Sequence, residues 1–236
     1  MSNLWLRIRA PFAAFRGFQA GVYRATAPVM PPSTALGLVL NLAGIEMRDS
    51  EPGVTTLIRS DLPCLRLAIG TVPQSDSETC SIYQQLHSYP VGESGKELKK
   101  RTHGAKYWIV PVRREFLVGL DMVLGIQADD EIVERVQKGL RGELDQDRYG
   151  LPFAGDNNFL FDRIDVLNQP IPVLWYTRMQ PDDSPMQGSY RLTIGIDRAN
   201  NSKTISHLYA PVKEASIEPP SNAWTWTPRE PESLAA

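Results

Sequence analysis

Residues 11–44 join a short strand to an apolar helix through a loop that contains arginines and no carboxylate. The preceding residues 4–9 alternate apolar and polar side chains, which predicts a half-buried strand that Pro11 ends. Residues 35–43 are apolar on nearly every face, so they predict a buried helix that Gly44 terminates. A basic loop that enters a buried helix is suited to holding an anion against a rigid body.

The loop and the helix start supply four candidate anion contacts. No Asp or Glu occurs before Glu46, whereas Arg16 and Arg24 both lie in the loop. Ser33 and Thr34 stand at the predicted helix start, where either side-chain oxygen can cap the first turn. We expect Arg16 and Arg24 to neutralise RNA phosphates and Ser33 and Thr34 to donate hydrogen bonds to them.

The overall charge of the chain argues against nucleic-acid binding, but its distribution argues for it. The formal net charge of the 236 residues is −2, whereas a nucleic-acid-binding domain is typically basic. Residues 96–115 hold seven Lys and Arg against two Glu, and residues 128–165 hold ten Asp and Glu against five Lys and Arg. A chain divided in this way can bind a polyanion with one part and a protein with the other.

The order of predicted elements indicates an α+β fold. After the first strand and helix come a strand at 63–70, two strand-like runs at 106–112 and 116–123, a helix that opens at 129–131 and ends at Gly142, and a strand at 158–167. This βαββαβ order is that of ferredoxin-like RNA-recognition domains. Three further strands are predicted at 171–179, 190–196 and 204–210. We therefore expect a ferredoxin-like domain at 1–168, a small β-rich part at 169–212 and an irregular Pro-, Glu- and Ser-rich tail at 213–236.

A long polar excursion at 71–102 carries a basic run and His87, and His103 follows it directly. Interleaved cations and aromatic or imidazole planes are what single-stranded RNA needs, because cations neutralise its backbone and flat side chains stack on its bases. The predicted contact strip consists of His87, Tyr89, Lys99, Lys100, Arg101, His103 and Lys106.

Metal, cofactor and membrane functions have little support. Cys64 and Cys80 are far apart and lack clustered histidines, so we expect two reduced thiols in a cytoplasmic protein, with no metal and no cofactor. No apolar run has the roughly 20 residues of a membrane span, and no signal peptide is evident. Asp156, Asn157 and Asn158 look like a site, but an Asx-stabilised turn explains them more simply.

The sequence resembles the fifth family of CRISPR-associated proteins, in the RAMP superfamily. The resemblance rests on the Phe15-Arg16 pair, the proline corner at 31–34, and the stretches at 103–121 and 148–167, which resemble the I-B-like branch. It implies a long β-hairpin thumb at about 71–106 and a subunit of a type I (Cascade) complex that grips the 5′ handle of the crRNA. It also implies contacts with the backbone subunit and the large PAM-reading subunit, with target DNA met through the complex. Such complexes serve defence or RNA-guided transposition, and the resemblance is compatible with both.

Most members of that family are not catalytic, although one subtype cleaves precursor crRNA with Tyr, Lys and His. Lys106 follows His103 by three positions here, whereas that subtype has an adjacent Lys-His pair. We therefore expect no enzymatic activity. A metal-independent endoribonuclease that uses His87 or His103 as general base is the alternative, and an RNA-free scaffold docked through its acidic segment is a third hypothesis.

Overall fold

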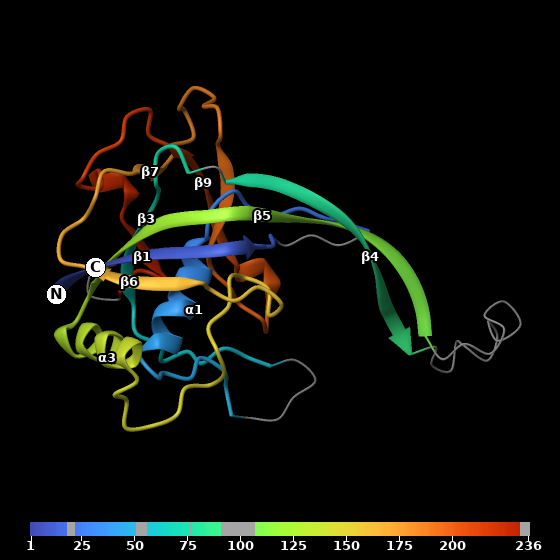
Figure 1. Ribbon diagram of the computed structural model, residues 1–236, viewed down its shortest axis with the longest axis horizontal. Coiled ribbons are helices and arrows are strands. Elements are labelled where there is room, and N and C mark those ends of the chain that lie inside the picture. The colour runs from blue at the N-terminus through green and yellow to red at the C-terminus, as the bar shows by residue number, and fades with distance from the viewer. Residues whose placement is uncertain (18–21, 51–55, 76, 91–106, 232–236) are drawn as a thin grey trace, which may run out of the picture.

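The computed structural model describes residues 1–17, 22–50, 56–75, 77–90 and 107–231, with only the backbone described at 86–90 and 107–110. Within these residues, a mostly antiparallel sheet forms the body of the molecule, and its two α-helices, α1 and α3, contact each other (Figure 1). A long curved hairpin extends from one end of the sheet. The α+β composition is therefore as predicted, with more strand than helix.

The centre of the sheet combines four strands in the order β6-β1-β5-β3. Each neighbouring pair is antiparallel. One helix follows β1 and the other follows β5, and the bounds of these six elements are β1 (Ser2–Ala13), α1 (Pro32–Leu42), β3 (Leu65–Thr71), β5 (Tyr107–Ala128), α3 (Asp130–Arg141) and β6 (Arg163–Leu167). The apolar face of β1 is fully buried, because Leu4, Leu6 and Ile8 pack into the main hydrophobic core.

Both helices lie close to their predicted positions. Gly44 follows the last turn of α1 with φ 68°, and Gly142 ends α3 with φ 73°, a left-handed conformation that glycine adopts without steric cost. Asp130 and Glu131 place negative charge in the first turn of α3, where the helix dipole favours it. Neither described α-helix is long and apolar enough to cross a membrane.

The predicted side-chain cap of α1 is wrong. Pro31 is the N-cap residue and no side chain caps the helix, since Ser33 and Thr34 already lie inside the first turn. Pro32 opens the helix with a fixed φ and without a backbone N–H, so fewer unpaired donors remain to be capped.

A long hairpin is present, but its limits differ from the predicted 71–106: β4 (Glu78–Pro90) lies within that range, whereas its partner strand β5 lies beyond it. Its pairing runs from Glu78 opposite Val118 to Pro90 opposite Tyr107. β5 is one continuous strand of 22 residues, not the two runs predicted around residues 113–115. The pairing with β4 is unbroken through these charged residues, so they lie within the strand and do not form a turn.

Two strand limits also differ from prediction. β1 continues past Pro11 to Ala13. β6 pairs only with residues 5–9 of β1, so at Pro11 the strand has β5 on one side and no paired strand on the other among the described residues. A proline, which lacks the backbone N–H, is tolerated at such an edge position. The predicted strand at 158–167 begins at Arg163, since residues 153–160 close a turn through a bridge between Phe153 and Leu160.

The three predicted C-terminal strands are confirmed, and they extend the same sheet in the order β3-β7-β9-β8. Their bounds, with the short helix between the last two, are β7 (Leu174–Arg178), β8 (Tyr190–Gly195), η1 (Asn201–Lys203) and β9 (Ile205–Pro211). The sheet thus continues across the predicted boundary at residue 168, through the pairing of β7 with β3.

The tail is more ordered than its composition predicted. It contains η2 (Ser221–Ala223) and β10 (Thr225–Thr227), and β10 pairs with β3. The rings of Trp224 and Trp175 lie 5.9 and 6.0 Å from the ring of Trp5. Half-buried tryptophan and buried threonine side chains therefore order a segment that is otherwise rich in Pro, Glu and Ser. On the polar face predicted for β1, Trp5 packs against these two tryptophans, whereas Arg7 pairs with Asp121 and Arg9 pairs with Asp165.

Candidate nucleic-acid interface

Four charged residues from distant parts of the sequence meet at the base of the hairpin, and we call them the arginine cluster. They are Arg16 after β1, Arg24 in β2 (Tyr23–Arg24), Arg114 in β5 and Asp156 in the turn before β6. β2 pairs in parallel with β5, which sets Arg24 opposite Arg114. The pairing of this short strand with β5 was not predicted from the sequence.

Backbone hydrogen bonds fix the loop that carries Arg16 and Arg24. The Phe15 N–H donates to Thr26 Oγ1 at 2.9 Å, and the Ala27 N–H donates to the Phe15 carbonyl at 2.7 Å. The Ala14 N–H donates to the Ala154 carbonyl at 3.0 Å, which ties the loop to the segment that contains Asp156. Arg16 is thus displayed from an anchored backbone.

One carboxylate serves two of the arginines. Asp156 Oδ2 forms ion pairs with the guanidinium groups of Arg16 and Arg114. Its Oδ1 accepts hydrogen bonds from the backbone N–H and the side-chain amide of Asn158, at 3.1 and 2.9 Å. The simpler interpretation of this stretch, an Asx turn, is therefore confirmed, and the same carboxylate also positions the arginines.

The cluster carries more positive than negative charge. Burial and the neighbouring positive charge of Arg24 lower the pKa of Arg16, and burial together with Arg16 and Arg24 lowers the pKa of Arg114. Arg16 and Arg114 nevertheless stay charged at neutral pH, because arginine ordinarily titrates above about 12. Three cations around one carboxylate leave an excess that an anion can neutralise.

The three arginines differ in accessibility. The Arg114 side chain is 8% exposed and donates to Gln84 Oε1 at 3.0 Å, whereas the Arg16 side chain is 35% exposed. Arg24 is half-buried. Arg16 and Arg24 can therefore reach a ligand, and Arg114 and Asp156 hold Arg16 in place.

Aromatic side chains adjoin the cluster. Tyr23 is 45% exposed, and its hydroxyl donates a hydrogen bond to Glu115. The centre of its ring lies 5.5 Å from the guanidinium carbon of Arg113. On β4, Tyr83 is 80% exposed and its backbone lies opposite that of Arg113. Exposed rings beside arginines are typical of single-stranded RNA surfaces. Sequence reasoning did not single out Tyr23, Tyr83 or Arg113, although Arg113 belongs to the basic run.

In the described part of the chain, Ser33 and Thr34 do not contact the arginine cluster. Both are half-buried in the first turn of α1, where the Thr34 N–H donates to the Pro31 carbonyl at 3.0 Å. Among the described residues, no hydrogen bond or ion pair links either of them to the arginine cluster. The structure does not join the four predicted anion contacts into one site.

Two members of the predicted contact strip, His87 and Tyr89, lie on β4 near the end of its described pairing with β5. The backbones of His87 and Tyr89 pair with Ile109 and Trp108, and the register shifts between the two pairs. The other members of the strip are outside the described residues, namely Lys99, Lys100, Arg101, His103 and Lys106. The role of the strip stays a prediction.

Neither the thiols nor the carboxylates form a metal site in the described part of the chain. Cys64 and Cys80 are both free and half-buried. No group of three or more His, Cys, Asp or Glu side chains comes together among the residues that the structure describes.

Comparison with known proteins places the chain in a family. The family model described as CRISPR-associated protein (Cas_Cas5) matches residues 3–142. No curated protein is significantly similar in sequence. A solved structure named "CRISPR RNA-guided surveillance complex" is similar with a TM-score of 0.54 at 12% identity, over 91% of this chain and 90% of that one. Another, named "Crystal structure of Cas protein", has a TM-score of 0.47 at 10% identity, over 92% of this chain and 96% of that one. With a family model that covers more than half of its length, the chain belongs to the Cas5 family of CRISPR-associated proteins.

Proposed function

We propose that this protein is a non-catalytic subunit of a type I CRISPR surveillance complex, in which it binds the 5′ handle of the crRNA. The arginine cluster carries the proposal, because three guanidinium groups with one carboxylate form an anion site at the base of the hairpin, beside the exposed rings of Tyr23 and Tyr83. Family membership supports the CRISPR setting, and the likeness in fold to a chain of a CRISPR RNA-guided surveillance complex supports assembly into such a complex.

In this proposal Arg16 and Arg24 contact handle phosphates, while the hairpin reaches the neighbouring backbone subunit. The acidic segment at 128–165 would dock the large PAM-reading subunit, so that target DNA is met through the complex. The complex would act in the cytoplasm. The strand order β6-β1-β5-β3, with a helix after β1 and after β5, supports a ferredoxin-like βαββαβ unit as the RNA-binding core.

Copurification tests this function directly. The chain is coexpressed with its neighbouring subunits and a CRISPR array, and nucleic acid is extracted from the purified complex. We expect a uniform RNA that begins with the repeat-derived handle. A complex that assembles without nucleic acid would instead support the scaffold hypothesis.

A nuclease assay separates the proposed role from the enzyme alternative. The purified chain is incubated with labelled repeat RNA in EDTA, and we expect the RNA to stay intact. Site-specific cleavage that disappears in His103→Ala would overturn the non-catalytic assignment and establish a metal-independent endoribonuclease.

A further inference from the structure

Two adjoining pockets lie apart from the arginine cluster and share none of its residues. The larger has a volume of about 630 Å³ and lies among the loop after α1, residues 146–149 and Phe153. The smaller, of about 430 Å³, is lined by the β8–β9 turn and by residues 57–60. Leu57, Ile58 and Arg198 line both, so the two pockets form one continuous groove.

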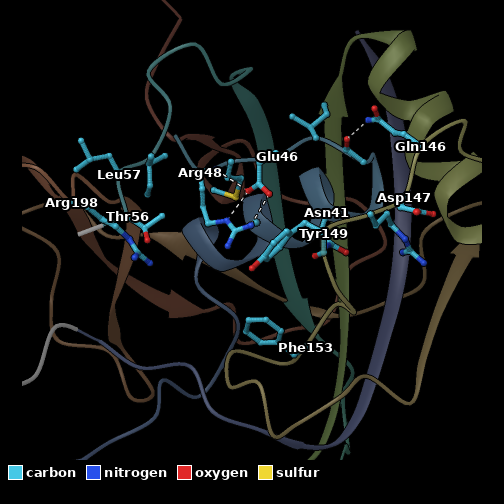
Figure 2. Close-up of a pocket in the computed structure, with 16 residues that line it drawn as sticks. Asn41, Glu46, Arg48, Thr56, Leu57, Gln146, Asp147, Tyr149, Phe153 and Arg198 are labelled. Carbon is cyan, nitrogen blue, oxygen red and sulfur yellow. Dashed lines mark hydrogen bonds and ion pairs between the residues drawn. The ribbon is translucent and has the colours of Figure 1, made fainter. Parts of the chain in front are cut away.

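A preformed stack of two flat groups lies in the larger pocket (Figure 2). The Arg48 guanidinium carbon lies 3.2 Å from the centre of the Tyr149 ring. Glu46 holds the guanidinium with two hydrogen bonds, from Nε at 3.0 Å and from Nη2 at 2.9 Å. Asn41 Nδ2 donates to the Tyr149 carbonyl at 3.0 Å, which fixes the backbone below the ring. The plane of the stack is therefore set before any ligand arrives.

The ring of this stack is available to a ligand. Arg48 covers one face of Tyr149, yet the residue is still 66% exposed. Apolar side chains complete the pocket around it, among them Met47, Ile58 and Phe153. A planar, partly apolar group with its own π-face, such as a nucleobase, matches these walls.

Cations lie along the groove next to the stack. Its lining contains six basic residues against four acidic ones, the basic set being Arg48, Arg59, Arg148, Arg198, Lys203 and Arg229 and the acidic set Glu46, Asp49, Asp147 and Asp197. Arg48 pairs with Glu46 and Arg59 pairs with Asp61. Within the described part of the chain, no ion pair is formed by the other four basic residues. Phosphate oxygens could supply the missing negative charge.

Arg198 is the cation that joins the two pockets, and its turn is rigidly held. Asp197 Oδ1 accepts the backbone N–H groups of Ala199 and Asn200, at 2.9 and 2.8 Å. Asp197 is therefore engaged with its own turn, and the exposed Arg198 side chain projects from a fixed backbone.

We propose that this groove binds a nucleotide unit, with its base on the Arg48–Tyr149 stack and its phosphate at Arg198. An acidic peptide could neutralise the cations but would have no use for the fixed stack, so the combination favours a nucleotide. The nucleotide belongs to a single-stranded nucleic acid or is a free mononucleotide. This site is additional to the handle contact at the arginine cluster.

Fluorescence anisotropy with a short labelled oligoribonucleotide tests the groove in the full chain. We expect Tyr149→Leu to weaken binding by about tenfold, the size typical for loss of one stacked base. Arg198→Ala should flatten the dependence of log affinity on log salt by about 0.7, the amount for one phosphate contact to a single strand. Arg191→Ala is the matched control, because Arg191 is an exposed arginine on β8 outside both pockets, and it should leave affinity unchanged.

A second set of variants separates this inference from the proposed function. In the Arg16→Ala, Arg24→Ala double variant, displacement of the labelled oligoribonucleotide by AMP would show that a free mononucleotide is enough to fill the groove. Displacement by unlabelled oligonucleotide but not by AMP would show that the groove needs a single-stranded nucleic acid. Unchanged affinity in both Tyr149→Leu and Arg198→Ala, with weaker binding in the double variant, would overturn the groove and support the arginine cluster. Weaker binding in the groove variants alone would support the groove and overturn the role of Arg16 and Arg24. If polyglutamate displaced the labelled oligoribonucleotide equally well from the wild type and from Tyr149→Leu, base stacking would be overturned.

Discussion

Asp156 and Arg114 form an ion pair although their side chains are only 7% and 8% exposed. They come from the turn before β6 and from the middle of β5, and Arg16 joins the same carboxylate oxygen from the loop after β1. A buried charge is costly without its partner, so this pair makes the fold and the candidate RNA site depend on one another.

Replacing Asp156 with Asn should destabilise the protein. The substitution keeps the oxygen that Asn158 contacts but leaves the buried Arg114 without a counter-charge, at a cost of about 3–5 kcal/mol. Thermal unfolding should show a melting temperature lower by roughly 6 °C or more. Asn158→Ala is the control, since it removes only side-chain hydrogen bonding to Asp156 and should cost about 1 kcal/mol. Equal destabilisation in the two variants would show that the turn matters and the ion pair does not.

Removing the accessible charge of the cluster should weaken RNA binding without unfolding the chain. Arg16→Ala with Arg24→Ala should lower affinity for handle RNA and reduce the salt slope by about 1.4, which is about 0.7 for each of the two phosphates. Filter binding across a salt series measures both quantities. Arg141→Ala removes an exposed arginine of α3 that pairs with Glu143, so it should change neither. An unaltered salt slope in the double variant would exclude Arg16 and Arg24 as phosphate contacts.

The Glu46–Arg48 pair predicts a pH dependence of stability. The hydrogen bonds from Arg48 lower the pKa of Glu46 from 4.5 to about 2. A carboxylate with a lowered folded-state pKa stabilises the protein above its unfolded-state value, and this stability is lost as pH falls through the folded value. The Glu46 side chain is 41% exposed, so solvent screening limits its contribution to about 1 kcal/mol or less.

Melting temperatures of the wild type and of Glu46→Gln, measured from pH 7 downward, test this dependence. The difference should stay constant above about pH 5 and vanish between 4.5 and about 2. A difference that persisted unchanged at the acidic end would contradict the assignment to this carboxylate.

Local patterns in the sequence predicted most of the elements but not how they meet. Apolar periodicity located both helices, and alternating strands with turn residues located β7, β8 and β9. Two errors had local causes: Pro11 was read as a strand end, although β6 does not pair with β1 there, and the charged residues at 113–115 were read as a break between two strands. The tail was misjudged because packing of Trp224 against Trp5 and burial of Thr225 and Thr227 outweigh its polar composition.

The candidate site was predictable only in part. Arg16 and Arg24 were found as cations in a loop without carboxylates, but their neighbours Arg114 and Asp156 lie roughly 90 to 140 positions further along the chain. Nothing local to Asp156 distinguishes an Asx turn from a counter-ion, because it performs both roles. Ser33 and Thr34 were grouped with the arginines by their proximity in sequence, which the fold does not preserve as a contact.

The turn that carries Asp156 gives a last test of the link between fold and site. Gly155 has φ 79°, and a Cβ atom there would collide with the Ala14 carbonyl and the Phe15 ring. Gly155→Ala should therefore lower stability by several kcal/mol, more than the roughly 1–3 kcal/mol of left-handed strain alone. It should also weaken handle binding, because Ala14 and Phe15 directly precede Arg16. Gly150→Ala is the matched control, with φ 67° and nothing within 4 Å of the added Cβ, so it meets the strain without the collision. Chemical denaturation and RNA titration of both variants measure the two effects. If the two variants were destabilised equally, contact between the turn and the loop would not support the arginine cluster.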